Sequence, residues 1–504
     1  MKKKIKKILI ANRGEIALRI IKTCRELGIK TVAIYSQVDR KGLHVQNADE
    51  ACEIGPPEAR ESYLNIDKII DVTKKLKCDA IHPGYGFLAE NYQFAQRCEA
   101  EKIIFIGPNS RALKLVGDKL RSRQTMATAG IPIIPGMKSA KKTHKEIQHF
   151  AEEIGYPVMI KASGGGGGKG MRIVRKASEL TSGLEAGSRE AKAAFGDDTV
   201  YLEKYIVKPR HIEFQVLADN QGNMVHLFER ECSIQRRYQK IIEETPSVAL
   251  DNNLRYQMGE VAKQVIQTAG YNNAGTVEFL LDENKNFYFL EVNARIQVEH
   301  PVTEMVTGID LIKQQIKIAG GEGLGLSQEQ LKQRGHAIEC RIYAEDPENN
   351  FFPSFGELLY VQEPFGPGIR CDSGIYSGME VPYHYDPILS KLIVWDESRQ
   401  AAIQKMNTAL SDYIILGVKT QIPFLKDLIQ HPQFMKGELN THFISEYFPD
   451  WKSIKAEKNL EIALLVAAIL RIRRPVKREE DSGKTTLTPW QLTGRWEMFS
   501  TYSK

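Results

Sequence analysis

The sequence predicts a multidomain protein that combines the α/β and α+β classes. Strands alternate with helices over residues 1–118, which is typical of a parallel sheet. β-Hairpins dominate residues 119–335, which is an α+β pattern. From His336 onward, short strands with Gly and Pro turns precede a helix that starts near Glu397. At 504 residues the chain is also long for a single hydrophobic core.

The first unit begins as strand, turn, helix and strand. Residues 7–11 form an apolar run that a polar Asn-Arg-Gly turn interrupts, and apolar residues then recur at helical spacing. Residues 31–35 are β-branched and apolar. The runs at 80–81 and 103–106 each lead into Gly and Pro residues. We therefore expect one parallel α/β domain over residues 1–118.

The later units are predicted from their turns. Residues 158–175 and 275–293 each contain two strand-like runs around turn residues, which predicts two hairpins. We expect a second unit over 119–335 and a third over 336–447. The residues that follow, 448–504, form a C-terminal extension.

The distribution of charge argues against a nucleic-acid-binding protein. The net charge is +6, but residues 451–504 carry eleven Lys and Arg against six Asp and Glu, so the body is nearly neutral. No apolar run approaches the roughly 20 residues that span a bilayer, and the run after the lysine-rich start is too short for an export signal. The seven cysteines are scattered, without a Cys-x-x-Cys pair, which indicates free thiols in a reducing compartment. We expect a cytoplasmic protein that binds neither nucleic acid nor membrane.

Five consecutive glycines, 164–168, lie inside the first predicted hairpin. Their bare amides can wrap a phosphate, with Lys169 as a point charge. The Walker A pattern fails because Ser163 and Gly170 stand where it requires Gly and Ser or Thr. The dinucleotide fingerprint is matched formally, but a strand follows where that motif needs a helix. A flexible surface hairpin is the alternative; a loop that closes over a triphosphate fits better.

The second predicted hairpin places two carboxylates opposite each other. With its turn centred between Asn284 and Lys285, Glu278 pairs directly with Glu291, about 5 Å apart at Cβ. Like charges in that position repel, so an ordinary solvated face, the alternative, would avoid them. Asn293, Arg295, Gln297 and Glu299 have the same strand parity as Glu291, so they share its face as far as the strand stays extended. Carboxylate and amide oxygens suit Mg²⁺, which bridges nucleotide phosphates, so the pattern predicts an ATP–metal site.

Longer motifs establish a resemblance to a known family. They are IANRGEIA (10–17), HPGYGFLAEN (82–91), KASGGGGG (161–168), EKY (203–205), PRHIE (209–213), RIQVEHPVTE (295–304) and GHAIECRIYAEDP (335–347). Through them the chain resembles the biotin carboxylase subunit of multi-subunit biotin-dependent carboxylases, which act on acyl-CoA or on pyruvate. The resemblance runs from Lys7 to about residue 447 and is most specific at 295–304.

The resemblance implies a fold and residue roles. The fold is an N-terminal α/β domain (1–118), an ATP-grasp domain (119–335) with a glycine-rich lid at roughly 131–205, and a biotin carboxylase C-terminal domain (336–447). The implied ATP-binding residues are Lys119, Lys161, Gly167, Gly168, Glu203, Lys204, Tyr205, Ile206, His211, Tyr238, Glu278 and Glu291. Two Mg²⁺ or Mn²⁺ ions would be bound by Glu278, Glu291 and Asn293. The implied bicarbonate-binding and catalytic residues are Lys240, Arg295 and Val298, Glu299 as the base, and Arg341 at the biotin ureido oxygen.

The implied reaction is the ATP-dependent carboxylation of biotin, with bicarbonate as the carbon source and carboxyphosphate as the intermediate. It forms a C–N bond and is the first half-reaction of an acyl-CoA or pyruvate carboxylase, as in fatty acid biosynthesis. The Ala-Met-Lys-Met signature does not occur in the chain, so biotin would arrive on a separate biotin carboxyl carrier protein. A carboxyltransferase subunit would select the final acceptor, and the chain itself would form a homodimer.

Two features depart from the family pattern, and two alternatives follow. Tyr238 stands near the nucleotide where members usually carry His, and the extension after residue 450 does not occur in shorter members. The alternatives are another ATP-grasp ligase, such as a carbamoyl-phosphate or purine-pathway enzyme, and a non-catalytic ATP-binding regulatory subunit. The stretch 295–304 together with Arg341 argues against the first, and the presence of Arg295 and Glu299 argues against the second.

The extension contains three of the four tryptophans, Trp451, Trp490 and Trp496. Its apolar run at 463–470 predicts one buried or docked helix, because it is too short to span a bilayer. A basic cluster follows at Arg471, Arg473 and Arg474. Trp and Arg often anchor interfaces, so we hypothesise that the extension recruits the carrier or the carboxyltransferase. The alternative is that it folds back onto its own C-terminal domain.

Overall fold

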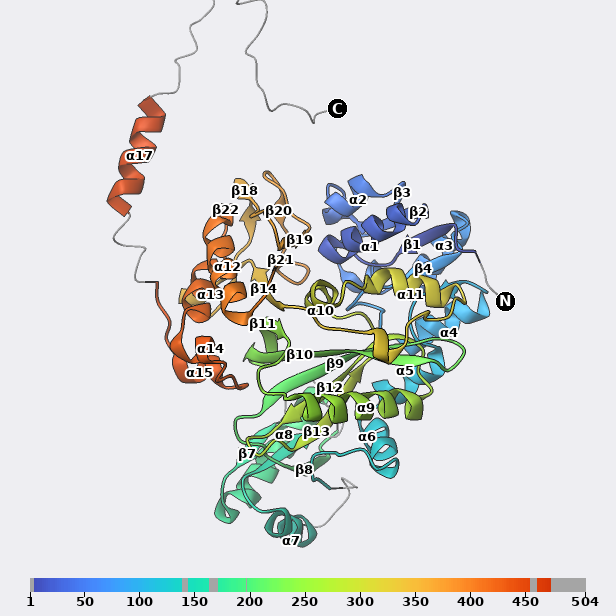
Figure 1. The fold of residues 1–504 in the computed structure, drawn as a ribbon, viewed down its shortest axis with the longest axis vertical. Helices are drawn as coiled ribbons and strands as arrows, with labels where there is room; N and C mark the ends of the chain where they lie inside the picture. Colours follow the sequence, from blue (N-terminus) through green and yellow to red (C-terminus); the bar gives the residue numbers. More distant parts are fainter. Residues whose placement is uncertain (1–3, 138–143, 163–170, 196, 454–459, 473–504) are drawn as a thin grey trace, which may run out of the picture. The chain divides into compact units, whose positions relative to one another are not determined.

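The computed structural model describes residues 4–137, 144–162, 171–195, 197–453 and 460–472. The chain divides into two units, Met1–Lys452 and Ser453–Lys504 (Figure 1). Among the described helices, none combines the length and the apolar character needed to cross a membrane.

The N-terminal part of the first unit is a five-stranded parallel sheet in the order β3-β2-β1-β4-β5. Its strands are β1 (Lys7–Ile10), β2 (Lys30–Ser36), β3 (Glu50–Gly55), β4 (Ala80–His82) and β5 (Ile104–Phe105). Its helices are α1 (Gly14–Glu26), α2 (Leu43–Asn47), α3 (Ile66–Lys75), α4 (Tyr92–Ala100) and α5 (Ser110–Gly117). Ile8, Leu9 and Ile10 of the central strand are fully buried, as expected where helices cover both faces of a parallel sheet. The predicted parallel α/β unit is confirmed.

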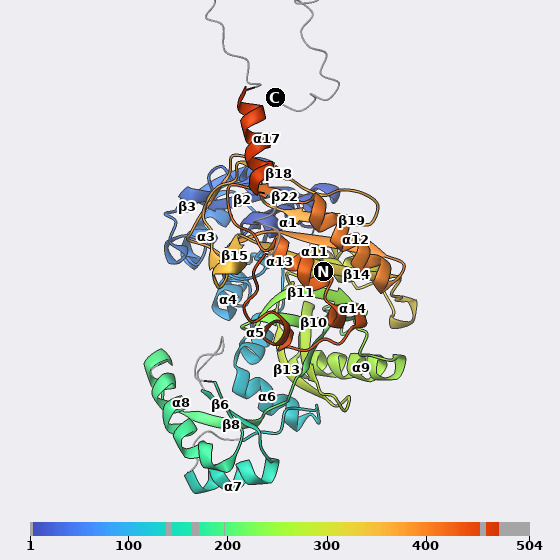
Figure 2. The same cartoon turned by 90° about the vertical axis from the view of Figure 1, so that its left-hand side faces the viewer.

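A small antiparallel sheet follows, in the order β7-β6-β8. It consists of β6 (Val158–Ala162), β7 (Arg172–Val174) and β8 (Val200–Lys204), with α6 (Lys119–Thr128), α7 (His144–Ile154) and α8 (Leu180–Phe195) beside it (Figure 2). Val158 pairs with Val174, so the first predicted hairpin is confirmed.

The largest sheet has eight strands in the order β13-β12-β9-β10-β11-β14-β21-β19. The strands are β9 (Arg210–Ala218), β10 (Met224–Arg236), β11 (Gln239–Thr245), β12 (Asn273–Leu281), β13 (Phe287–Asn293), β14 (His336–Tyr343), β19 (Ile369–Ser373) and β21 (Ile388–Asp396). The helices in this stretch of the chain are α9 (Asn252–Ala269), α10 (His300–Thr307) and α11 (Leu311–Ala319). β14 begins at His336, where a third unit was predicted, yet it pairs with β11 of the second unit. The sheet is therefore continuous across that boundary, and the domain limits stay predictions.

The second predicted hairpin has the expected register at its carboxylates, but next to its turn the pairs are displaced by one residue, with Phe279 opposite Phe289 and Leu281 opposite Phe287. β12 and β13 pair antiparallel, with Glu278 directly opposite Glu291. The strand ends at Asn293, so the predicted parity does not extend to residues 295–299. The chain leads from there into α10, so the parity argument, which applies only while the strand stays extended, reaches no further than Asn293.

The remaining part of the first unit carries short strands and helices. The strands are β15 (Glu345–Asp346), β16 (Phe352–Pro353), β17 (Gly356–Glu357), β18 (Tyr360–Gln362), β20 (Glu380–Val381) and β22 (Ile414–Leu416). The helices are α12 (Arg399–Asp412), α13 (Ile422–Ile429), α14 (Pro432–Lys436) and α15 (Phe443–Tyr447). Trp451 packs edge-on against Phe424, with ring centroids 5.4 Å apart, and its Nε1 donates to Asp427 at 2.8 Å. This tryptophan thus belongs to the first unit, not to a separate extension.

The second unit contains α17 (Leu460–Ile472), which confirms the helix predicted at 463–470. Its described side chains between Ile462 and Ile469 are exposed, including Leu464 at 61% and Leu465 at 64%. Whether this helix is buried or docked stays a prediction. Trp490, Trp496, Arg473 and Arg474 lie outside the described residues.

Candidate active site

A cavity of about 380 Å³ lies where the small sheet faces strands β9, β10, β12 and β13 of the large sheet. The described residues predicted to bind ATP all line it: Lys119, Lys161, Glu203, Lys204, Tyr205, Ile206, His211, Tyr238, Glu278 and Glu291. Gly167 and Gly168 lie outside the described residues. The polar groups converge from α6, β6, β8, β9, β12 and β13, so one pocket collects residues from positions 119 to 291.

Sequence reasoning missed the other lining residues, among them the polar side chains of Arg123, Gln235, Thr441 and His442. His442 Nε2 lies 3.0 Å from the Tyr205 hydroxyl, and Gln235 Nε2 lies 2.7 Å from His211 Nδ1. Arg123 forms an ion pair with Glu203. Gln235 stands three residues before Tyr238, so inspecting that segment could have found it. His442 had no local signal, because it reaches the cavity from a distant part of the chain.

Basic side chains lie next to both of the paired carboxylates. Glu278 contacts Lys240 Nζ at 2.8 Å, His211 Nε2 at 3.0 Å and Asn293 Nδ2 at 2.8 Å. Glu291 contacts Lys119 Nζ at 2.7 Å. Burial opposes ionisation of Glu278, yet Lys240 and His211 hold the pKa of its carboxyl well below its usual range. The Glu278 carboxylate is thus available as an anion.

The donor set fits a hard divalent cation. Glu278 and Glu291 face each other across the hairpin, and the Asn293 amide lies on the same strand as Glu291. Ligand atoms of His211, Glu213 and Glu278 also lie within 4.8 Å of one another. Carboxylate and amide oxygens are the ligands that Mg²⁺ prefers, together with nucleotide phosphates.

Glu299 lies at the start of α10 and is fully buried. Its carboxylate contacts Lys240 Nζ at 2.7 Å and Arg341 Nη2 at 3.0 Å. Burial would raise its pKa, but Lys240, Arg341 and Arg230 together hold the pKa of Glu299 well below its usual range. The site therefore keeps an ionised carboxylate out of water, beside two cations that can also bind an anionic substrate.

Residues 294–298 connect the carboxylate pair to Glu299. Arg295 donates to Gln297 Oε1 at 2.8 Å and to Asn293 Oδ1 at 3.2 Å. The Val298 carbonyl accepts a 2.8 Å hydrogen bond from Lys391, a fully buried lysine of β21. Sequence reasoning did not single out Lys391. A lysine within a predicted strand ordinarily belongs to a solvated face.

Tyr238 lies on the rim of the cavity. It occupies the turn between β10 and β11, has a positive φ of 67°, and is 64% exposed. The Tyr238 side chain is therefore not one of the buried charged groups of the site.

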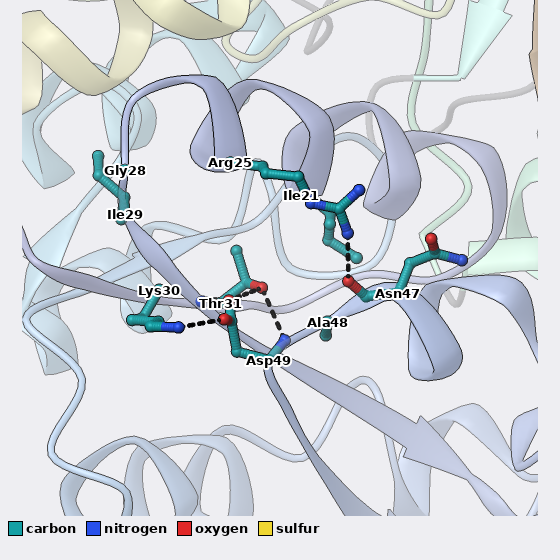
Figure 3. Close-up of a pocket in the computed structure, with 9 residues that line it drawn as sticks. All are labelled: Ile21, Arg25, Gly28, Ile29, Lys30, Thr31, Asn47, Ala48 and Asp49. Carbon is teal, nitrogen blue, oxygen red and sulfur yellow. Dashed lines mark hydrogen bonds and ion pairs between the residues drawn. The ribbon is translucent and has the colours of Figure 1, made fainter. Parts of the chain in front are cut away.

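A second hollow of about 350 Å³ lies in the N-terminal sheet and contains none of the predicted site residues. Its charged groups already have partners: Arg25 donates to the Asn47 carbonyl at 3.0 Å, and Lys30 donates to Asp49 at 2.7 Å (Figure 3). It therefore offers little unpaired charge to a ligand.

The small sheet and the large sheet, with cationic and anionic groups around the cavity between them, define an ATP-binding ligase of the ATP-grasp class. Three family descriptions match successive parts of the chain: "Biotin carboxylase, N-terminal domain" at 4–113, "Carbamoyl-phosphate synthase L chain, ATP binding domain" at 118–327, and "Biotin carboxylase C-terminal domain" at 339–446. The chain belongs to the biotin carboxylase family.

Individual relatives agree with this membership. The chain is 54% identical to a pyruvate carboxylase subunit of Methanothermobacter thermautotrophicus, over 88% of this chain and 90% of the relative. It is 53% identical to biotin carboxylase 1 of Bacillus subtilis, over 88% of this chain and 99% of the relative. The biotin carboxylase domain of Hydrogenobacter thermophilus 2-oxoglutarate carboxylase, solved as a dimer with MgADP, ADP and bicarbonate, superposes with a TM-score of 0.83 at 48% identity, covering 88% of this chain and 98% of that one. The predicted family, fold class and type of reaction are confirmed.

Proposed function

We propose that this protein uses ATP and bicarbonate to carboxylate biotin carried by a separate protein. The observation that carries the proposal is the position of Glu299: a buried, ionised carboxylate that shares Lys240 with Glu278. One lysine therefore joins the predicted metal and nucleotide site to the predicted base. A ligase that activates bicarbonate with ATP needs these two sites side by side.

Each buried group has a task in this proposal. Glu299 accepts the bicarbonate proton, while Lys240, Arg295 and the backbone at Val298 hold the anion. Lys119 and Lys161 neutralise the phosphates of ATP, and Arg341 supports negative charge on the ureido oxygen of biotin. Phosphoryl transfer depends mainly on such positioning and charge neutralisation rather than on covalent help from the protein.

Glu278, Glu291 and Asn293 would hold two Mg²⁺ or Mn²⁺ ions together with the nucleotide. The bound metal would neutralise phosphate charge during transfer. In the described structure Lys119 is paired with Glu291, and Lys240 is paired with Glu278. When ATP and the metal bind, Lys119 would turn to the phosphates and Lys240 would turn to bicarbonate.

The partners follow from the same reaction. We infer that a biotin carboxyl carrier protein brings the substrate and that a carboxyltransferase subunit removes the product. The proposal includes a homodimer, in keeping with the dimer of the Hydrogenobacter domain.

One assay tests the proposal against both alternatives. ATP cleavage by the purified chain should require bicarbonate, rise when free biotin is added, and yield carboxybiotin. Another ATP-grasp ligase would respond to a different acceptor, such as ammonia, and not to biotin. A non-catalytic subunit would bind ATP without cleaving it.

A further inference from the structure

Arg341 contacts two buried carboxylates at once. From β14, its Nε donates to Glu243 Oε1 at 2.6 Å and its Nη2 donates to Glu299 Oε2 at 3.0 Å. Glu243 lies on β11, the neighbouring strand, whereas Glu299 begins α10. Both carboxylates are fully buried. The guanidinium is therefore held through two different nitrogens by groups from two different elements.

The two carboxylates cannot serve the same purpose during the reaction. In the proposed function Glu299 takes the bicarbonate proton and then ceases to be an anion, so its ion pair with Arg341 weakens. The Nη2 atom becomes free to face the ureido oxygen of biotin. A guanidinium held by Glu299 alone would lose its orientation at the step that requires it. The bond from Nε to Glu243 does not depend on the charge of Glu299.

We propose that Glu243 is the positioning residue of Arg341, holding Nε in place while Nη2 passes from Glu299 to the ureido oxygen. This inference rests on the proposed function, because it assigns Arg341 to biotin. Only an arginine suits this arrangement, since its rigid fork offers Nε and Nη2 as separate donors with fixed relative directions. A lysine would have a single nitrogen for both tasks.

Glu339 provides a matched control. It stands directly opposite Glu243 across the β11–β14 ladder and is equally buried. Neither of its carboxylate oxygens has a hydrogen-bond partner among the described residues. Burial, with Glu243 and Glu299 nearby, raises the pKa of Glu339 well above its usual range. Since no hydrogen bond joins this carboxyl to Arg341, it does not hold the guanidinium in place.

The protonation state of Glu243 sets the conditions of the test. Burial raises its pKa to about 7, against the opposing effect of Arg341. The assays are therefore run about one pH unit above that value, where the anion that holds Nε predominates.

The test compares Glu243→Gln and Glu339→Gln with the wild type in two assays. One measures carboxylation of free biotin, and the other measures bicarbonate-dependent ATP cleavage without biotin. We expect Glu243→Gln to lower kcat/KM for biotin by about tenfold or more, because a charge-assisted bond is lost. Its ATP cleavage should stay near that of the wild type, and Glu339→Gln should retain both activities. Equal losses in both assays for Glu243→Gln, or the same biotin defect in Glu339→Gln, would overturn the inference.

A double-mutant comparison keeps the inference testable if Glu243→Gln does not fold. Glu243→Asp retains the charge but withdraws the carboxylate, and it is combined with Arg341→Lys, which removes Nε. If Glu243 acts through Arg341, the aspartate should impair biotin carboxylation in the wild type and add no further loss to Arg341→Lys. A full additional loss in the double variant would contradict the inference. A wild-type enzyme that ignores biotin would instead refute the proposed function itself.

Discussion

At the scale of single residues, the active site is a set of buried charges that cancel. Lys240 contacts Glu213, Glu278 and Glu299, and these anions raise its pKa well above the usual range despite burial. Arg230, fully buried, donates to Glu213 and to Thr303. A single buried charge is costly, but a paired and hydrogen-bonded one is tolerated. Removing one of these charged side chains should therefore change both the rate of the reaction and the charge balance of the buried site.

Glu299→Gln should reduce bicarbonate-dependent ATP cleavage by at least about a hundredfold, because the change keeps the shape and removes the base. Nucleotide affinity should stay close to normal, since Glu299 does not line the ATP cavity. Steady-state kinetics and titration of ATP binding by calorimetry measure the two effects. A loss of affinity as large as the loss of turnover would place Glu299 with the metal ligands instead.

Arg341→Ala should lower biotin carboxylation by about a hundredfold, as expected for a donor to a developing oxyanion. Bicarbonate-dependent ATP cleavage without biotin should fall much less, because Arg341 is assigned to the second half of the reaction. The two rates are measured on the same preparation. If both fall to the same extent, Arg341 acts in the first half-reaction as well.

At the scale of elements, one carboxylate connects β11 to β14 and α12. Glu244 contacts His336 Nε2 at 2.8 Å and Arg399 Nε at 2.7 Å. Arg399 also donates to the Phe434 carbonyl at 2.8 Å, at the end of α14. The second and third predicted units therefore share this buried cluster as well as the sheet, and the cluster should contribute to global stability.

Glu244→Gln should lower the free energy of unfolding at neutral pH by about 3 kcal/mol, because a buried ion pair loses one partner. Burial opposes ionisation, but His336 and Arg399 lower the pKa of Glu244 from 4.5 to about 2. The stabilisation is therefore complete above pH 4.5 and disappears as the pH falls toward 2. Urea unfolding at several pH values should show the difference between wild type and variant narrowing over that range.

The control for this measurement is Glu53→Gln, which removes an exposed ion pair with Arg40. It should leave the unfolding midpoint nearly unchanged, because exposed pairs contribute little. A constant difference between Glu244→Gln and the wild type from pH 7 down to pH 3 would contradict the assignment of the charged form to Glu244.

At the scale of the whole molecule, the boundary between the two units bears on function. Trp451 packs into the first unit, and the second unit begins at Ser453. The apolar side chains of α17, such as Leu464 and Leu465, are not buried within their own unit, and an apolar helix face of this kind is a surface that a protein contact covers. The hypothesis made for the extension from Trp451 onward is therefore narrowed: we propose that residues 453–504, which form the second unit, recruit the carrier or the carboxyltransferase.

Deleting residues 453–504 should leave carboxylation of free biotin unchanged and weaken activity with the carrier-bound substrate by about tenfold or more, since lost interface anchors dominate binding energy. Pull-down of the carboxyltransferase and carrier by the two forms measures assembly directly. Unchanged assembly and unchanged carrier activity would refute the hypothesis. A deletion that starts at residue 451 is the comparison, because it also removes Trp451 and should lower the melting temperature.

The sequence by itself determined the features that depend on neighbouring residues. The hairpin and its acidic pair followed from local sequence, and Glu278 does lie opposite Glu291. The turn alone does not set this pairing, because the pairs next to the turn are displaced by one residue and an irregularity between Glu278 and Phe279 restores the predicted register. Local periodicity likewise predicted the parallel N-terminal sheet and the helix at 463–470. The motif at 295–304 was specific enough to identify the family.

Only the tertiary structure decided which groups meet across long stretches of chain. The bond from Arg341 to Glu243 joins residues 98 positions apart, the bond from Lys391 to Val298 joins residues 93 apart, and His442 meets Tyr205 across 237 positions. No local pattern encodes these contacts, because they depend on how strands, helices and loops from separate segments pack together. The same holds for the end of β13 at Asn293, where packing into α10 overrides strand parity. The sequence thus determined which residues form the active site, and tertiary packing decided which charged groups pair with each other there.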